Sequence, residues 1–188
     1  MKVIISILTI IFILISSAVV LQVQAQSGVI RQLTQSETLR LDQREVIYPL
    51  PYPGLLTDHP LYSLKEWRDR ILIFTTRDNV KKAQLYLHLS DKRMATALQL
   101  AKKGKEQLSK RELTNAETFF LKIPPLLIDA KKQGGGLSED FVTKLKQSNA
   151  KHKEVITDVM KDLNQAEIKT FQTILEMNSR ATKEIERL

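Results

Sequence analysis

The sequence predicts an all-α protein: a bundle of three to four helices, with a proline-rich N-terminal arm before it and a long C-terminal helix at its end. From Leu61 onward, apolar residues recur every three or four positions, which is the period of a helix with one buried face. Beyond that point, glycine and proline occur only at the joins between periodic segments, and residues 138–188 contain neither. The chain has no cysteine, so its stability must come from apolar packing rather than from disulfides.

The N-terminus has the pattern of an export segment. Lys2 precedes nineteen uncharged residues, Val3 to Leu21, and small residues suited to cleavage end at Ala25. The apolar stretch is longer than most signal cores and close to the ~20 residues that span a bilayer. We therefore expect residues 1–25 to be a signal peptide or an uncleaved membrane anchor. In both cases the remainder lies outside the cytoplasm, secreted or membrane-anchored.

Two segments separate this region from the helices. Residues 26–47 are polar and lack a sustained period, which indicates a tether. Residues 48–59 are expected to be an extended arm, because Tyr48 to Gly54 alternates proline with bulky side chains. Residues 60–188 form the predicted helical domain.

Four helical segments are expected in this domain. Pro60 suits the first position of one helix, and Asp78 is a good N-cap for a second that stops at Gly104. A capping box at Ser109 opens the third, which Pro124 and Pro125 must break or kink.

The fourth segment runs from Ser138 to Leu188 with apolar spacing near 3.5 residues, as in a coiled coil, although Asn149 and His152 interrupt the stripe. It either bends near Asn164 or projects from the bundle toward a partner.

A short motif opens the helical domain. Gly54-Leu55-Leu56 precedes Pro60-Leu61-Tyr62-Ser63-Leu64-Lys65, and a leucine- and alanine-rich helix, Ala83 to Ala97, follows before Gly104. Over about residues 48–105 this resembles the bacterial domain-of-unknown-function family numbered fifty-six sixty-seven, with Ser90 and Thr96 where that pattern has alanine and an acidic residue. The resemblance implies an all-helical extracytoplasmic domain and no assigned activity.

The motif residues are expected to form a structural lock rather than a pocket. Leu61, Leu64 and Trp67 should pack inward behind Pro60, Tyr62 should clamp the arm, and Lys65 should pair with Asp69 one turn later.

Positive charge is concentrated in one block. Residues 61–111 carry thirteen Lys and Arg against five acids, whereas residues 112–188 are balanced at twelve each. Such a block can attract an anionic membrane or cell-wall surface, or can simply be a solvated face that keeps the protein soluble. The expected contact residues are Lys81, Lys82, Lys92, Arg93, Lys102, Lys103 and Lys105. Export argues against nucleic acid as a partner.

Catalytic and metal-binding patterns are missing from the sequence. The three histidines are isolated, none is preceded by Glu at the third position as di-iron bundles require, and no nucleophile elbow or phosphate loop occurs. His88 and Asp91, one turn apart, are expected to form a surface pair rather than a metal site. We expect no enzyme activity and no cofactor.

The expected function is a non-enzymatic interaction or structural module at the cell envelope, with the long C-terminal helix available to a protein partner or to a second copy. The alternatives are a membrane-anchored extracytoplasmic sensor or regulatory domain and, less favoured, a metal-binding helical protein.

Overall fold

The computed structural model of the chain describes residues 46–161, 163 and 165–188. The predicted export segment (residues 1–25) and nearly all of the predicted tether (26–47) lie outside the described residues. Within them, residues 46–61 form neither helix nor strand, and the rest is helical with no strand. The helices are α2 (Tyr62–Thr75), α3 (Asn79–Lys102), α4 (Glu106–Phe120), α5 (Ile123–Lys132), α6 (Glu139–Met160) and α7 (Gln165–Ile185).

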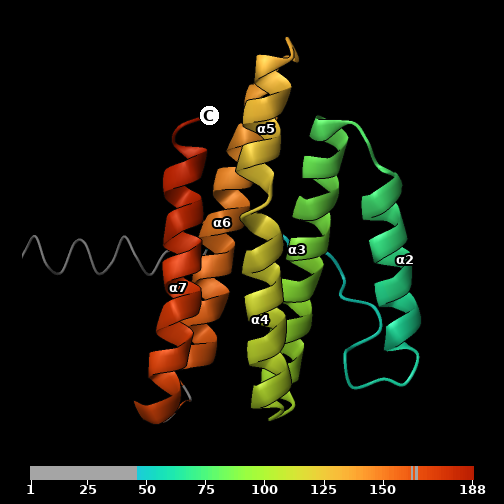
Figure 1. The fold of residues 1–188 in the computed structure, drawn as a ribbon. Coiled ribbons are helices and arrows are strands. Elements are labelled where there is room, and N and C mark those ends of the chain that lie inside the picture. The colour runs from blue at the N-terminus through green and yellow to red at the C-terminus, as the bar shows by residue number, and fades with distance from the viewer. Residues whose placement is uncertain (1–45, 162, 164) are drawn as a thin grey trace, which may run out of the picture. The chain divides into compact units, whose positions relative to one another are not determined.

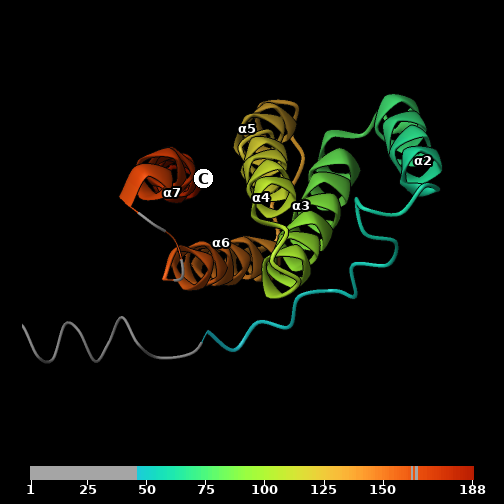
Figure 2. The same ribbon diagram turned by 90° about the horizontal axis from the view of Figure 1, so that it is seen from below.

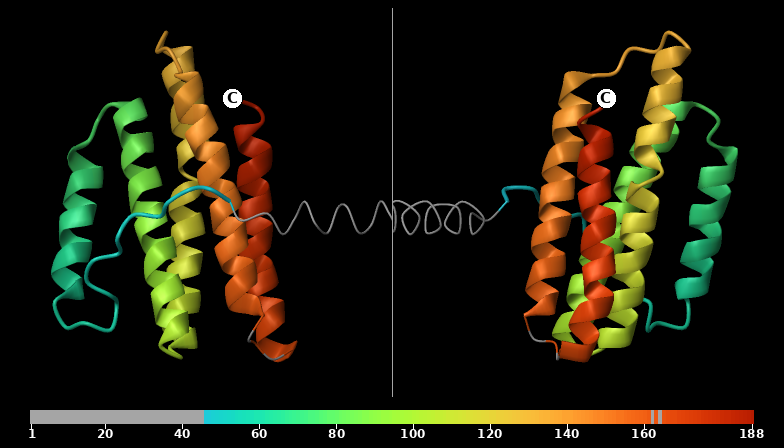
Figure 3. Two further views of the ribbon diagram at one scale, coloured as in Figure 1. Left: turned by 180° about the vertical axis from the view of Figure 1, so that it is seen from behind. Right: turned by 60° about the vertical axis from the view of Figure 1, so that its left-hand side comes forward.

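Four rods form the bundle: α3, the successive helices α4 and α5, α6, and α7 (Figures 1 and 2). Helix α3 packs against α4, α5 and α6, and α7 packs against α4, α5 and α6. Helix α2 lies outside this group against α3, and residues 46–61 run across α6 and α3 to reach it, in front of both in the left view of Figure 3. The predicted all-helical bundle is therefore confirmed.

The same four rods supply two apolar clusters, one above the other. The first includes Leu87 of α3, Phe120 of α4, Leu127 of α5 and Leu145 of α6, with Ala181 and Ile185 from α7. The second includes Met94 of α3, Leu113 of α4, Ile156 of α6 and Phe171 of α7. Because each rod contributes to both clusters, the core of the described domain is continuous along the bundle.

The long C-terminal helix is a wrong prediction, because residues 138–188 fold as two helices that pack against each other, α6 and α7. The reversal lies between Met160 and Gln165, where Lys161 N–H donates to Asp158 O and Leu163 N–H to Met160 O in the tighter i→i+3 pattern. Folding back buries Phe171 and Ile174, which a single projecting helix would expose. The expected bend near Asn164 is in this region, but it is a full reversal.

The other helix boundaries agree with the predictions to different degrees. Asp78 caps α3 by accepting a hydrogen bond from the Lys81 backbone N–H (2.7 Å), as predicted. Helix α4 begins at Glu106, before the predicted capping box, and Ser109 instead donates its hydroxyl to Ala97 O of α3 (2.8 Å). The two prolines separate α4 from α5 and occupy the first turn of α5, where a missing N–H costs little.

No helix in the described part of the chain combines the length and the apolarity that a membrane span requires.

Candidate functional site

A group of polar side chains lies inside the bundle, between the two apolar clusters. Along each rod, the polar residues lie between those that belong to the first apolar cluster and those that belong to the second. The interior polar cluster, as we name it, consists of Asp91 of α3, Glu117 of α4, Ser148, Asn149 and His152 of α6, and Asn178 of α7, all buried.

His152 is the centre of this cluster. Its Nδ1 lies 2.8 Å from Glu117 Oε1, and its Nε2 lies 3.1 Å from Asp91 Oδ1. The ring also meets Phe120 edge-on, at 5.2 Å between centroids. Both ring nitrogens are therefore engaged by carboxylates that come from two other helices.

The carboxylates have further partners. Asp91 accepts hydrogen bonds of 2.6 Å from the hydroxyl of Ser148 and, at its other oxygen, from the hydroxyl of Tyr48 in the segment before α2. Asn178 donates to both the backbone and side-chain oxygens of Asn149 at 3.0 Å. The cluster thus ties all four rods and the 46–61 segment together.

Electrostatics keep His152 charged. Burial lowers its pKa, but the hydrogen bonds to Asp91 and Glu117 and the negative charge of both carboxylates outweigh burial and raise the pKa to about 9. Burial, with Asp91 beside it, also raises the pKa of the Tyr48 hydroxyl, which stays a donor. At neutral pH the cluster holds an imidazolium between two carboxylates.

This arrangement is suited to stability rather than to chemistry. His152 has no exposed surface, and neither ring nitrogen has a lone pair free for a ligand. Among the described residues, no group of three or more His, Cys, Asp or Glu is arranged to hold a metal ion. The expected surface pair of His88 and Asp91 is wrong, because Asp91 is buried and turned to His152.

The motif that opens α2 is divided between two faces of the helix. Tyr62 is buried, and its hydroxyl lies 3.3 Å from both carboxylate oxygens of Glu112 and 3.1 Å from Arg93 Nη1. Lys65 Nζ donates to the carbonyls of Pro53 (2.9 Å) and Leu55 (3.2 Å), so Lys65 holds the preceding segment. Asp69 pairs with Arg68 instead of Lys65.

The apolar residues of the motif do not pack inward, contrary to the prediction. Leu61 is 52% exposed, Leu64 66%, Trp67 66%, Ile71 55% and Phe74 86%. Leu64, Trp67, Ile71 and Phe74 form the α2 apolar face, on the side of the helix opposite Tyr62 and Asp69, and Leu61 and Leu72 lie at its edges. Periodicity correctly grouped these residues on one face, but α2 contacts the bundle through its other side, where Tyr62 and Asp69 are buried and Ile73 packs against the first apolar cluster.

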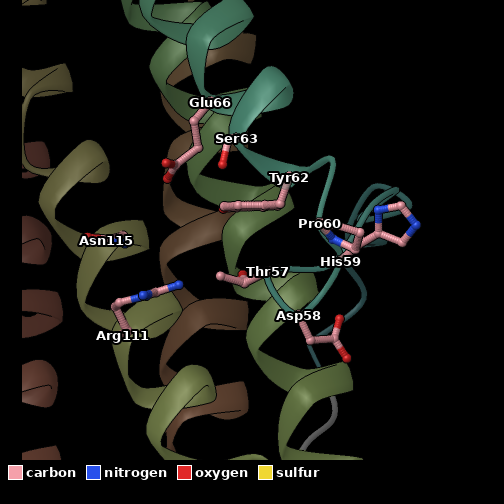
Figure 4. A pocket seen from close by; sticks show the side chains of 9 residues that line it. All are labelled: Thr57, Asp58, His59, Pro60, Tyr62, Ser63, Glu66, Arg111 and Asn115. Carbon is pink, nitrogen blue, oxygen red and sulfur yellow. The ribbon is translucent and has the colours of Figure 1, made fainter.

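A polar hollow of about 590 Å³ lies where α2 approaches α4 (Figure 4). Glu66 and Arg111 reach toward it from the two helices, and Tyr62 forms part of its wall, while His59 points away. Pro60 belongs to its rim. The hollow is open, and Tyr62 in its wall is engaged with Glu112 and Arg93.

The seven basic residues expected on an anionic contact surface do not act as one group. Arg93 is wrongly included, because its guanidinium is mostly buried and pairs with Glu112 (3.0 Å) and Glu66 (3.6 Å). Lys103 and Lys105 both face Asp58, at 3.7 and 2.7 Å. Lys81 and Lys102 are exposed, and Lys82 and Lys92 are half-buried.

Sequence reasoning missed the interior polar cluster as a unit. A signal was present, since Asn149 and His152 interrupt the apolar stripe of α6 three residues apart. The two carboxylate partners of His152 lie 35 and 61 positions away in the chain, and no local pattern connects them to it.

The fold and its interior define a helical-bundle domain fastened by a buried ionic cluster. The chain belongs to the family described as Domain of unknown function (DUF5667), which matches residues 54–188. The match confirms the resemblance and extends it through α7. No curated protein and no solved structure matches the chain.

Proposed function

We propose that this protein is an exported, non-enzymatic interaction or structural module that works at the cell envelope. Its export rests on the sequence of the first residues, where Lys2 precedes an uncharged apolar stretch that ends in small residues. Its action as a module rests on the helical domain that follows.

The single observation that carries the proposal is the α2 apolar face. A helical domain with two filled apolar clusters has no need to expose Trp67 and Phe74 on one side of one helix. Contiguous apolar surface of this kind marks an interaction site on soluble domains. In the interior polar cluster, in contrast, His152, Asp91 and Glu117 are buried and pair with one another.

The same reasoning locates the partner contact. The apolar residues of α7, such as Phe171 and Ile185, are used within the bundle, and this supports α2 rather than the C-terminal helix as the contact element. The remaining basic residues, among them Lys81 and Lys102, stay candidates for contact with anionic envelope material.

The test is the N-terminal residue of the protein from cells, together with the fraction that contains it. A start at Gln26 in the extracytoplasmic fraction supports a secreted module. An intact N-terminus in the membrane supports an anchored module and favours the sensor alternative, which needs that route for its signal. An intact chain in the cytoplasmic fraction overturns the proposal.

A further inference from the structure

The α2 apolar face is not covered by the other helices of the bundle. Leu64, Trp67, Ile71 and Phe74 follow each other at spacings of three, four and three, so they line one side of the helix. All four are exposed, and Phe74 is the most exposed of them. The described part of the chain leaves this face uncovered.

Helix α2 is held by its opposite side, through polar contacts and through Ile73, which packs against the first apolar cluster. Tyr62 bonds to Glu112 of α4, and Glu66 lies 3.6 Å from Arg93 of α3. Lys65 binds the carbonyls of the preceding segment. The orientation of α2 is therefore determined by directional contacts, and its apolar side faces outward as a consequence.

The charge around the face is basic. Arg70, Arg77 and Lys81 are exposed on α2 or just after it, and Arg68 is exposed but pairs with Asp69. The acids nearby are engaged: Asp69 with Arg68, Glu66 with Arg93, and Asp78 with the N-terminus of α3. Basic residues beside an outward row of Leu, Trp, Ile and Phe are the pattern of a helix that lies in a membrane interface.

The size of the face favours a bilayer over a second copy of the chain. Helix α2 has 14 residues and is about 21 Å long, and at about 200 Å² for each large side chain the exposed fractions of Leu64, Trp67, Ile71 and Phe74 amount to roughly 550 Å². A specific protein interface buries about 800 Å² on each partner. A bilayer sets no such minimum, because weak interfacial binding suffices when a second element of the same chain is also attached.

We propose that α2 lies in the interface of an anionic lipid bilayer, with Leu64, Trp67, Ile71 and Phe74 among the acyl chains and the neighbouring arginines at the headgroups. The inference rests on the anchored form of the proposed function, in which the uncleaved apolar segment Val3 to Leu21 supplies the second attachment.

Trp67 is the only tryptophan of the chain, so its fluorescence reports on α2 alone. The full chain is reconstituted into vesicles of phosphatidylcholine and into vesicles of equal phosphatidylcholine and phosphatidylglycerol. Emission and quenching are recorded with brominated acyl chains in the bilayer and with iodide in the water. We expect a blue shift, quenching by the brominated lipid and protection from iodide, each larger with phosphatidylglycerol present.

The matched variants keep Trp67. The double substitution Leu64→Gln and Ile71→Gln should abolish the blue shift and the lipid quenching, whereas Thr118→Gln with Thr157→Gln, on exposed faces of α4 and α6, should leave both unchanged. All four positions are exposed, so folding is preserved, and far-UV circular dichroism checks this.

Three outcomes contradict the inference. If the chain is attached to vesicles while Trp67 stays open to iodide, α2 does not reach the bilayer, although the envelope location still stands. If Trp67 becomes protected without lipid, in proportion to protein concentration, a second copy covers the face. If phosphatidylglycerol has no effect, the arginines do not contribute. Failure of export in cells would contradict the proposed function alone.

Discussion

His152 shows how one residue decides the chemistry of a core. A buried imidazolium would be costly alone, but two carboxylates at 2.8 and 3.1 Å and the donors Ser148 and Tyr48 satisfy the charges and lone pairs around it. The same saturation removes the free nitrogen that a metal or a catalytic base would need. At the scale of single residues, this is a structural cluster.

Removing His152 should destabilise the fold strongly. In His152→Ala, Asp91 and Glu117 remain buried without their counter-charge, and we expect the free energy of unfolding to fall by about 3–5 kcal/mol. Urea unfolding followed by circular dichroism measures this. His88→Ala, at an exposed histidine, is the control and should change stability by less than about 0.5 kcal/mol. Equal effects of the two substitutions would refute the role of the cluster.

Stability should also fall in mildly alkaline solution. The pKa of His152 is about 9 in the folded state, above the ordinary value of 6.5, so folding favours the protonated ring. The resulting stabilisation, roughly 3 kcal/mol, is complete below about pH 6.5 and is lost as the pH rises through about 9. Chemical unfolding across this range tests it. A free energy that is constant or rises there in the wild type, or that falls equally in His152→Ala, contradicts the prediction.

At the scale of elements, the residue at which a helix ends and the direction in which its apolar face points have different causes. The end of α3 is determined locally: Gly104 has φ +69°, Lys105 N–H bonds to Leu100 O at 2.9 Å, and Gly104 N–H bonds to Ala101 O at 2.8 Å. This is a Schellman motif, in which glycine takes the left-handed position. The direction that α2 faces is not local, because it depends on Glu112 and Arg93 in other helices.

Gly104→Ala should therefore cost about 1–2 kcal/mol of stability, since an L side chain is strained at this φ even though the space beside it is open. Gly136→Ala is the matched control: the space there is also open, but its φ is not in the left-handed region. Thermal unfolding of both variants provides the comparison. A loss as large in Gly136→Ala would show that backbone strain at Gly104 is not the cause.

The whole described domain should behave as one cooperative unit. The rods α3, α4/α5, α6 and α7 contribute to both apolar clusters, with the interior polar cluster between them. Helix α2 stands apart, because it supplies Ile73 to the edge of the first cluster while Leu64, Trp67 and Phe74 are exposed.

Leucine substitutions at three places should separate these roles. Leu113→Ala and Leu127→Ala, each in a different cluster and each fully buried, should lower the free energy of unfolding by about 2–5 kcal/mol and keep a single transition. Leu64→Ala, on the α2 apolar face, should change it by less than about 0.5 kcal/mol. Two resolved transitions in either core variant would mean that the clusters unfold independently.

Much of this architecture could be predicted from the sequence because its causes are local. The Asp78 cap, the Gly104 stop and the break at Pro124 and Pro125 act within a few residues, and periodicity identifies apolar faces. The candidate site could not be predicted in the same way. Pairing of His152 with Asp91 and Glu117 joins three helices, and no spacing along the chain encodes it.

The sequence by itself determined the all-helical class, most helix limits and the family, since these follow from backbone propensity, capping and short patterns. Only the tertiary structure decided that residues 138–188 fold back on themselves, that a charged histidine lies at the centre of the core, and that the α2 stripe faces outward. A periodic apolar stripe gives the same sequence pattern whether it packs against its own bundle, against a neighbouring helix or against a lipid bilayer. Which of these it meets depends on contacts between residues far apart in the chain.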